Sequence, residues 1–432
     1  MLHIYVSEIN NRIKYTLDFV FKERGVRYKL CHNYSDFIEI NEPKINYSNT
    51  TIENVLSVNT SAVLYDSDAG NYAIDKNIFF KEECLTFNGK TDPFASVFYI
   101  LSRMEEYTTI QRDKWGRFEG KNSVLYRFDW HEKAICDRWS MDIILWLKEN
   151  NILIQPIKKS SFKVLPTFDI DNAYAYKHKG IWRTILSNSK DLLLGRQKRF
   201  FERQKVIAGT FRDPYDTYDK IYELKEKNIE FKMFWLLGDF AKFDRNVSFR
   251  HKRHKRLIQR MRMACEIGIH PSVKSNNYEF FLHNEIERLE KIIGNRVHFS
   301  RQHYLKLKLP NTYETLIEQE INEDYTMGFA DVCGFRLGTA RQINWFNLRE
   351  NKITRLKLQP FAFMDGTLNE YMKLNPEEAI KKIDDLYVEV KNFGGVFSFI
   401  WHNETIGDYG IWKGWSNVFI HSIEKCIEIN EK

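Results

Sequence analysis

LPTFDIDNAYAYKHKG, residues 165–180, is the stretch from which the rest of the chain can be interpreted. A largely apolar run from Phe162 to Ile170 carries one acid, Asp169, near its end, and a second acid, Asp171, follows directly. Such runs are typical of strands that are covered on both faces. Because α/β proteins collect catalytic residues at the carboxyl ends of their strands, the two acids predict the edge of an active site. An acidic turn with a helix N-cap is the structural alternative for a lone acid pair.

Length and composition predict a globular protein with more than one core. The chain has 432 residues, of which 43% are hydrophobic, so two or three domains are expected. Lys and Arg outnumber Asp and Glu by 65 to 58. A net charge of +7 is mild over this length, so no nucleic acid is expected as a partner.

Cysteine usage and hydropathy indicate in which cellular compartment the protein is expected. The six cysteines lie far apart and form no CxxC pair, which favours a reduced, cytoplasmic protein. The N-terminal residues are polar and charged throughout, and no apolar run reaches the roughly 18 residues that span a bilayer. We therefore expect neither an export signal nor a transmembrane segment.

The chain divides into two parts at a short polar link, IKKSS, residues 157–161. Residues 1–156 alternate short apolar runs with polar turns and include two helical patterns. One of these begins with Asp92 as the cap, and the other lies near 139–147. They predict a small α/β or α+β domain of unknown role.

Residues 157–432 alternate strand-like and helix-like stretches. About seven strands with helices between them predict an α/β domain with a deformed, incomplete (β/α) barrel. The strands are expected at 163–170, 230–237, 266–270, 296–300, 324–329, 357–362 and 396–401, and the helices at 215–227, 251–265, 279–293, 310–322 and 376–392.

Several of these strands are followed by side chains suited to chemistry. His270, Arg301, His303 and His402 each come just after a predicted strand. A single histidine in such a place is more often part of the packing. Together with the acids of the first strand, however, they predict a site for Zn²⁺ or another divalent metal.

The stretches TFDID, HPSVKS, SRQHY, DYTMGFAD and WHNE follow one another between residues 162 and 410. In this order they resemble the motifs of polysaccharide deacetylases of the NodB-homology type. The resemblance implies that Asp169 is the catalytic base and that Asp171 and His270 are metal ligands. It also implies that Arg301 orients the base.

The same resemblance implies further roles. The backbone N–H of Tyr304 would help to stabilise an oxyanion, and His402 would protonate the leaving amine, with Asp324 tuning that histidine. The stretches DPFASVFYILSRMEEY and RDKWGRF in the first 120 residues are similar to a domain of undefined role. That domain precedes deacetylase-like domains in Bacteroidetes-type proteins.

The chain also departs from the family pattern. Lys274, followed by Ser275, stands where the family has a second metal-binding histidine, and His303 replaces a proline of the third motif. A protonated lysine cannot bind a metal. We therefore expect His303 to complete a triad with Asp171 and His270; without it, two protein ligands would make a weak site.

Other features suggest contacts with substrate or with a surface. Arg336, in the glycine-punctuated loop 334–342, could contact substrate, and Trp401 and Trp412 could stack on sugar rings or pack in the core. The predicted helix around 250–262 is rich in cations. A solvated face is the ordinary interpretation, and a contact with an anionic glycan or membrane surface is the alternative.

The expected function is therefore a metal-dependent hydrolase that removes N-acetyl groups from an amino sugar in a polysaccharide or glycan precursor. A catalytically impaired glycan-binding or assembly protein that keeps the deacetylase fold is the alternative. A nucleic-acid-binding protein ranks last, because the cations lie on one helix without a reading motif.

Overall fold

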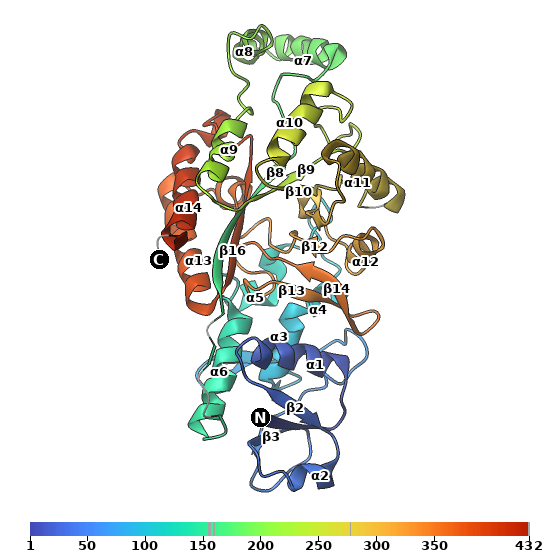
Figure 1. The fold of residues 1–432 in the computed structure, drawn as a ribbon, viewed down its shortest axis with the longest axis vertical. Coiled ribbons are helices and arrows are strands. Elements are labelled where there is room, and N and C mark those ends of the chain that lie inside the picture. Colours follow the sequence, from blue (N-terminus) through green and yellow to red (C-terminus); the bar gives the residue numbers. More distant parts are fainter. Residues whose placement is uncertain (154–156, 159, 277, 431–432) are drawn as a thin grey trace.

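A computed structural model describes residues 1–153, 157–158, 160–276 and 278–430. The molecule is elongated, with the N-terminal residues at one end and helices α7 and α8 at the other (Figure 1). It is a mixed α/β structure. The predicted boundary at 156 lies outside the described residues, as does Lys159 of the predicted link.

The first 150 residues contain two small sheets. One has the order β2-β1-β3-β4 with parallel pairing, and the other is the antiparallel β5-β6-β7. The strands are β1 Leu2–Val6, β2 Tyr28–Cys31, β3 Lys44–Tyr47, β4 Leu56–Ser57, β5 Ile74–Ile78, β6 Glu83–Phe87 and β7 Lys90–Thr91. The α-helices are α1 Asn11–Leu17, α2 Tyr34–Ile38, α3 Pro93–Leu101, α4 Met104–Thr108, α5 Val124–Arg127 and α6 Ile135–Glu149.

Both helices predicted in this part are present. Asp92 caps α3, because its side chain accepts a hydrogen bond from the backbone N–H of Ala95. The pattern near 139–147 lies inside α6, which is longer than predicted.

The remainder of the chain forms one sheet of nine strands in the order β13-β14-β12-β11-β10-β9-β8-β16-β15. The strands are β8 Phe162–Ile170, β9 Lys232–Trp235, β10 Glu266–Ile269, β11 Phe299–Ser300, β12 Glu323–Asp324, β13 Ile343–Asn347, β14 Lys352–Leu358, β15 Phe363–Met364 and β16 Gly395–His402. All neighbours are parallel except β13 and β14. The seven predicted strands overlap β8, β9, β10, β11, β12, β14 and β16, whereas β13 and β15 were not predicted.

The sheet has two ends, β13 and β15, and no strand ladder among the described residues joins them. A closed barrel is therefore not confirmed. The short segment 359–362 nevertheless contacts strands near both ends. The N–H of Gln359 donates to the carbonyl of Asp324 on β12 (2.9 Å), and the N–H of Ala362 donates to that of Ser398 on β16 (2.8 Å).

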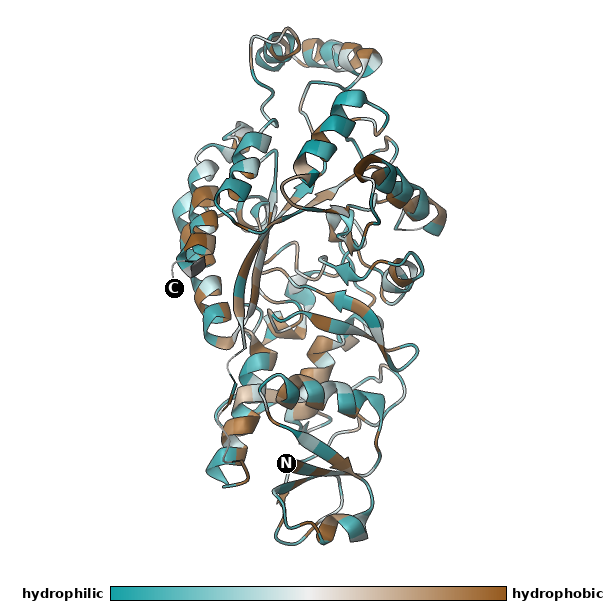
Figure 2. Cartoon of the chain, viewed as in Figure 1, coloured by the Kyte–Doolittle hydropathy of each residue, from teal (hydrophilic) through white to brown (hydrophobic). Residues whose placement is uncertain are grey.

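The helices of this part lie around the sheet, except α7 and α8, which lie at the tip of the molecule (Figure 1). They are α7 Ile181–Leu193, α8 Gln197–Ile207, α9 Tyr218–Glu226, α10 Lys252–Arg262, α11 Glu279–Ile293, α12 Asn311–Glu318, α13 Pro376–Phe393 and α14 Trp415–Asn430. The five predicted helices correspond to α9–α13, and α13 begins with a capping box of Asn375 and Glu378. Helices α13 and α14 each carry hydrophobic and hydrophilic residues side by side (Figure 2), and their hydrophobic residues join the core.

The two parts of the chain share buried charges. The guanidinium of Arg336 donates to both carboxylate oxygens of Glu106, at 2.9 and 2.6 Å. Arg103 donates to the same Glu106 (2.7 Å) and to the carbonyl of Arg336 (2.7 Å). The prediction that Arg336 contacts substrate is therefore wrong, because its guanidinium is buried in the contact between the two parts.

No helix among the described residues is long and apolar enough to span a bilayer.

Candidate active site

The predicted site residues gather at the carboxyl ends of neighbouring strands. Asp169 lies at the end of β8, opposite His402 at the end of β16. His270 directly follows β10, and Arg301 directly follows β11. These parallel strands end at one edge of the sheet, where Asp169, His270 and His402 line a cavity of about 600 Å³. Arg301 contacts Asp169 and does not itself line the cavity.

The cavity has two walls. We call the first the sheet-end wall; it consists of Asp169, Asp171, His270, His303 and His402. We call the second the outer wall; it consists of Lys114, Trp115, Arg117, Glu370 and Tyr371. Residues of the outer wall come from the first part of the chain and from the segment after β15, neither of which the sequence linked to the site.

Asp169 is oriented by a buried arginine. Nη1 of Arg301 lies 2.8 Å from Oδ1 of Asp169, and both side chains are almost wholly buried. The Nε–H of Arg301 donates to the carbonyl of Tyr325 (3.0 Å), which fixes the plane of the guanidinium. The predicted arginine–aspartate contact is therefore present, and Oδ2 of Asp169 lies 3.9 Å from Nε2 of His270.

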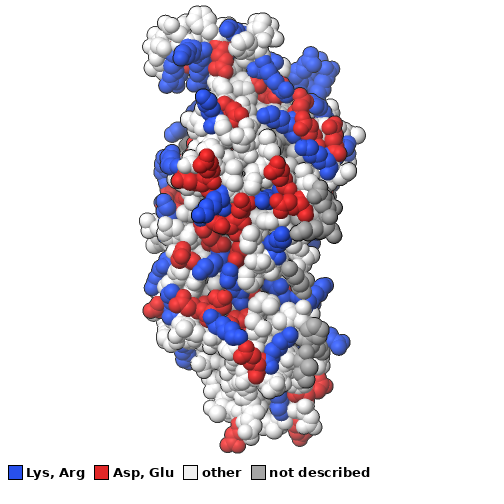
Figure 3. Space-filling model, turned by 90° about the vertical axis from the view of Figure 1, so that its left-hand side faces the viewer, with Lys and Arg blue, Asp and Glu red and all other residues white. Residues whose placement is uncertain are grey.

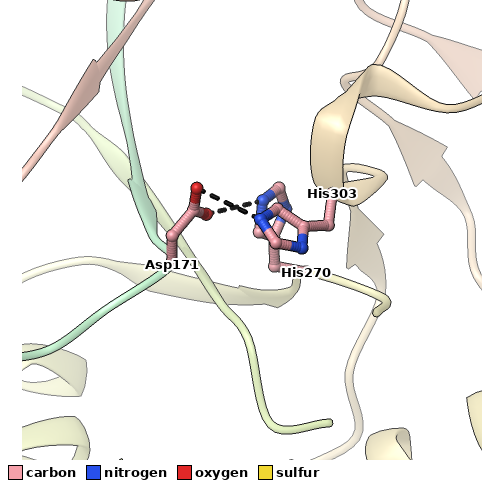
Figure 4. Close-up of side chains that lie close together, drawn as sticks. All are labelled: Asp171, His270 and His303. Atoms are coloured by element: carbon pink, nitrogen blue, oxygen red, sulfur yellow. Dashed lines mark ion pairs between the residues drawn. The ribbon is translucent and has the colours of Figure 1, made fainter. Parts of the chain in front are cut away.

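Asp171, His270 and His303 meet as predicted (Figure 4). Oδ1 of Asp171 lies 3.0 Å from Nε2 of His270, and Oδ2 lies 3.2 Å from Nε2 of His303. One potential ligand atom from each residue lies within 4.8 Å of the others. Oδ1 of Asp171 is buried and has no hydrogen-bond partner among the described residues, although His270 is close.

The second nitrogen of each ring shows why this set suits a cation. Nδ1 of His270 lies 2.5 Å from the carbonyl oxygen of Arg301, and Nδ1 of His303 lies 2.9 Å from Oδ1 of Asp244. Because both partners are acceptors, each Nδ1 carries a hydrogen, and each Nε2 faces Asp171 as the atom that can bind either a proton or a metal. One carboxylate and two imidazole Nε2 atoms are the kind of ligands that a divalent metal such as Zn²⁺ prefers.

The electrostatics of the cluster agree with this description. Burial would raise the pKa of Asp171, but the neighbouring His303 and His270 hold it well below its ordinary value. Burial would lower the pKa of His303, yet the carboxylates of Asp171 and Asp244 raise it to about 9. Without a cation, a proton on His303 balances the charge, and a bound metal would take the place of that proton.

The sequence did not point to Asp244, which lies in the loop after β9. It is buried, and besides His303 it accepts a hydrogen bond from the backbone N–H of Val273 (3.1 Å). It therefore ties the loop that follows His270 to the ring of His303. No strand precedes Asp244 directly and no motif contains it, so a sequence pattern could not reveal it.

His402 is backed by a carboxylate that was also missed. Nδ1 of His402 lies 2.8 Å from Oδ1 of Asp365, and the backbone N–H of His402 donates to Oδ2 (2.7 Å). The hydroxyl of Thr405 donates to the same Oδ2 (2.6 Å). Burial lowers the pKa of His402, but the carboxylates of Asp365, Asp171 and Asp169 raise it well above its ordinary value.

The assignment of Asp324 as the partner of His402 is therefore wrong. Asp324 is buried beside β11, where it accepts hydrogen bonds from Ser300, Tyr313 and Thr326. Asp365 follows the apolar stretch 360–364 and comes directly after β15. The rule that located Asp169 could have found Asp365, had the predicted strand 357–362 been extended by two residues.

Tyr304 lines the cavity, and its backbone has a left-handed conformation (φ 60°). Arg117 of the outer wall donates to the carbonyl of Tyr304 (3.3 Å) and to the hydroxyl of Tyr371 (2.9 Å). The ring of Trp115 lies 6.2 Å from the ring of Tyr304. The first part of the chain thus contacts the segment predicted to stabilise an oxyanion.

Of the remaining predicted residues, one lines the cavity and the others do not. Trp412 lines the cavity, as a substrate contact requires. Trp401 does not, because it is fully buried and its indole N–H donates to Ser422 (3.1 Å). Lys274 is exposed and lies over the ring of Phe281, so it takes no place among the candidate ligands.

The basic helix predicted around 250–262 is α10. It packs its apolar residues inward and leaves most of its cations exposed, as a solvated face requires. Lys252, Arg253, Lys255 and Arg256 are among the exposed set.

Comparisons with known proteins give one family model and a group of solved structures. A family of unknown function, DUF7033, matches residues 2–152. No curated protein matches the chain. Structural similarity extends over about two thirds of the chain.

Three solved structures illustrate that similarity. A polysaccharide deacetylase-type protein from Mycobacterium smegmatis is 16% identical, over 63% of this chain and 86% of the other, with a TM-score of 0.39. PuuE allantoinase is 13% identical, over 63% and 84%, with a TM-score of 0.38. The polysaccharide deacetylase Bc1974 from Bacillus cereus is 11% identical, over 63% and 89%, with a TM-score of 0.30.

A CE4 family pseudoenzyme from Bacillus anthracis is also among the similar structures. Scores and identities this low establish no activity for the present chain. Its chemistry has to be deduced from the side chains of its own cavity.

Proposed function

We propose that the protein is a metal-dependent hydrolase that removes the acetyl group from an N-acetylated amino sugar. One observation carries the proposal. The acceptor cluster of Asp171, His270 and His303 lies beside two groups suited to proton transfer, Asp169 and His402. Each of these two has a buried partner that orients it, Arg301 for the acid and Asp365 for the histidine.

Asp171, His270 and His303 would hold the metal. A divalent cation such as Zn²⁺ would polarise the amide carbonyl and make water a better nucleophile. Asp244 and the carbonyl of Arg301 would hold the two imidazoles in the tautomer that leaves Nε2 free for the metal.

Asp169 and His402 would handle the protons. Asp169 would take a proton from the water as its oxygen attacks the carbonyl carbon, and the backbone N–H of Tyr304 would stabilise the negative charge on the carbonyl oxygen. As the C–N bond breaks, His402 would give a proton to the nitrogen. One water is consumed, acetate and a free amino sugar leave, and the proton on Asp169 returns to His402 through solvent.

The outer wall supports a sugar as the substrate. Trp115, Tyr304 and Tyr371 bring aromatic rings to one side of the cavity, and Trp412 lines it as well. Aromatic faces bind the apolar faces of sugar rings, while the polar side chains nearby can accept and donate hydrogen bonds to hydroxyl groups.

The proposal extends to the architecture. We interpret the nine-stranded sheet as a deformed (β/α) barrel whose gap is bridged by the chain segment 359–362. We also interpret residues 1–156 and 157–432 as two domains. The separate sheets of the two parts support this division.

Metal binding gives the first test. Apo-protein titrated with Zn²⁺ in a calorimeter should bind one equivalent, and His303→Ala should lose affinity about as strongly as His270→Ala. Asp244→Asn should lose roughly ten- to a hundredfold, as changes to groups that orient a ligand do. Lys274→Ala is the matched control and should bind as the wild type does.

Acetate release gives the second test. The metal-loaded protein should release acetate from oligomers of N-acetylglucosamine or a related amino sugar, and Asp169→Asn should not. Tight zinc binding without acetate release from any N-acetyl amino sugar would contradict the proposed hydrolase. Full metal retention by His303→Ala would contradict the triad.

A further inference from the structure

The hairpin of α7 and α8 lies at the tip of the molecule (Figure 1). It exposes apolar side chains that a water-facing helix normally hides. Trp182 is 78% exposed, Leu186 69% and Leu193 86%. These positions are four and seven residues apart, so they lie along one face of α7. Ile181, Ile185 and Leu192 widen this face, which we call the α7 stripe.

The opposite face of α7 is polar and points inward. Asp191 is buried and pairs with Arg203 of α8. Arg203 also donates to Oδ1 of Asn188 (2.7 Å), and Gln204 donates to the same oxygen (3.1 Å). The helix is therefore oriented with its polar side against α8 and its apolar side toward solvent, the reverse of an ordinary surface helix.

The hairpin is fixed to the rest of the molecule. Glu202 of α8 accepts hydrogen bonds from the hydroxyls of Tyr176 (3.2 Å) and Tyr409 (3.0 Å). Arg183 of α7 donates to the carbonyls of Asn246 (3.0 Å) and Arg245 (2.8 Å). The α7 stripe is thus presented in a defined direction.

The surroundings of the stripe are strongly cationic. Residues 177–212 contain ten Lys or Arg and only two Asp or Glu. Figure 3 shows uncharged surface at the tip, with Lys and Arg at its edges and a small acidic group between them. The exposed cations of α10 lie close by, because the ring of His251, its N-cap, is 4.7 Å from that of His178 just before α7.

We propose that the α7–α8 hairpin binds the surface of an anionic membrane, with the α7 stripe inserted among the lipids and the cations facing the headgroups. An apolar stripe with a tryptophan, edged by Lys and Arg, has the composition of helices that lie in a membrane interface. A second copy of the chain is a poorer occupant, because the same cations would face each other across such a contact. This inference does not depend on the proposed function.

Vesicle sedimentation tests the proposal with the full chain. Wild-type protein should sediment with vesicles of equimolar phosphatidylcholine and phosphatidylglycerol and stay in solution with phosphatidylcholine alone. Trp182→Glu combined with Leu186→Glu should weaken binding by roughly tenfold or more, because the stripe then carries charge. Since both side chains are exposed, the variant should unfold at the wild-type temperature.

A matched variant controls for added negative charge. Ile78→Glu combined with Ile110→Glu makes the same change at exposed positions in the first part of the chain, 63% and 94% exposed. It should bind vesicles as the wild type does. High salt should weaken binding of the wild type, because the headgroup contacts are screened.

Three results would overturn the proposal. One is that the wild type stays in solution with the anionic vesicles at low salt. Another is that the stripe variant binds as tightly as the wild type, which would place binding elsewhere. The third is a wild-type dimer that the stripe variant dissociates, without vesicle binding, which would identify a second copy as the occupant.

Discussion

The sheet-end wall and the outer wall of the cavity differ in how their side chains are held. On the sheet-end wall, Asp169 and His270 are nearly inaccessible to solvent, and each has a buried partner behind it. On the outer wall, Lys114 and Glu370 are exposed and Trp115 is only half-buried. Arg117 is the exception, because it is buried and connects the two walls through Tyr304.

This difference indicates that the sheet-end wall serves catalysis and the outer wall serves substrate binding. Buried polar groups with fixed partners keep the geometry that proton transfer and metal binding need. Half-exposed aromatic and charged groups can adapt to a substrate and contribute mainly to binding. Changes in the sheet-end wall should therefore lower kcat, and changes in the outer wall should raise KM.

The largest expected effect belongs to Asp169. Asp169→Asn keeps the size of the side chain and removes the base, so kcat should fall by roughly 10²–10⁴ while KM changes little. Steady-state acetate release measures both constants. A variant with normal kcat would show that the sheet-end wall does not supply the base.

The next largest effect is on stability, and it belongs to Glu285, which lies behind the sheet-end wall. Glu285 on α11 accepts hydrogen bonds from the backbone N–H (2.9 Å) and the hydroxyl (2.6 Å) of Ser272, two residues after His270. Burial raises the pKa of Glu285 from 4.5 to about 7. The folded state therefore binds this proton more tightly than the unfolded state.

The free energy of unfolding should therefore fall as the pH rises. The stabilisation from Glu285 is complete below pH 4.5 and is lost as the pH rises through about 7. The free energy of unfolding should fall by about 3 kcal/mol over this pH range. Glu285→Gln should remove it, so the variant should gain stability relative to the wild type as the pH rises. Urea unfolding over this pH range checks the trend, and parallel curves for the two proteins would exclude it.

A smaller effect separates the two buried aspartates. Asp365→Asn should lower kcat by roughly 10², because His402 loses the carboxylate that orients it. Asp324→Asn should leave kcat near normal and cost about 1–3 kcal/mol of stability, because its partners lose a buried acceptor. Comparison of kcat with urea unfolding for the two variants tests the corrected assignment. Equal losses of kcat would argue against it.

The smallest effect belongs to the outer wall. Trp115→Ala should raise KM by up to about tenfold, the contribution of one stacked aromatic side chain, and leave kcat unchanged. Trp115→Phe keeps an aromatic face and should restore much of the affinity. A fall in kcat without a change in KM would place Trp115 with the catalytic groups and remove the contrast between the walls.

The sequence predicted the sheet-end wall well because one geometric rule governs it. Parallel strands end at one edge, so residues at or just after the carboxyl ends of β8, β10, β11 and β16 had to meet. Asp365 follows the same rule but was missed, because its strand, β15, has only two residues. Asp324 was misassigned because a residue at a strand end can also point into the packing.

Other features could not be predicted from local patterns. Asp244 and Trp115 reach the site from loops, and loop paths depend on the whole fold. The amphipathic pattern of α10 correctly predicted a buried apolar face, whereas α7 has the opposite orientation. Periodicity shows that a helix has two faces, but the neighbouring elements decide which one is covered.

The buried contact of Arg336 with Glu106 and Arg103 makes the two parts of the chain mutually dependent. A protein that began after residue 156 would lose the carboxylate partner of Arg336 and would expose to water the surface that the first part covers. It would also lack Trp115 and Arg117. The proposed site therefore needs side chains from both parts of the chain.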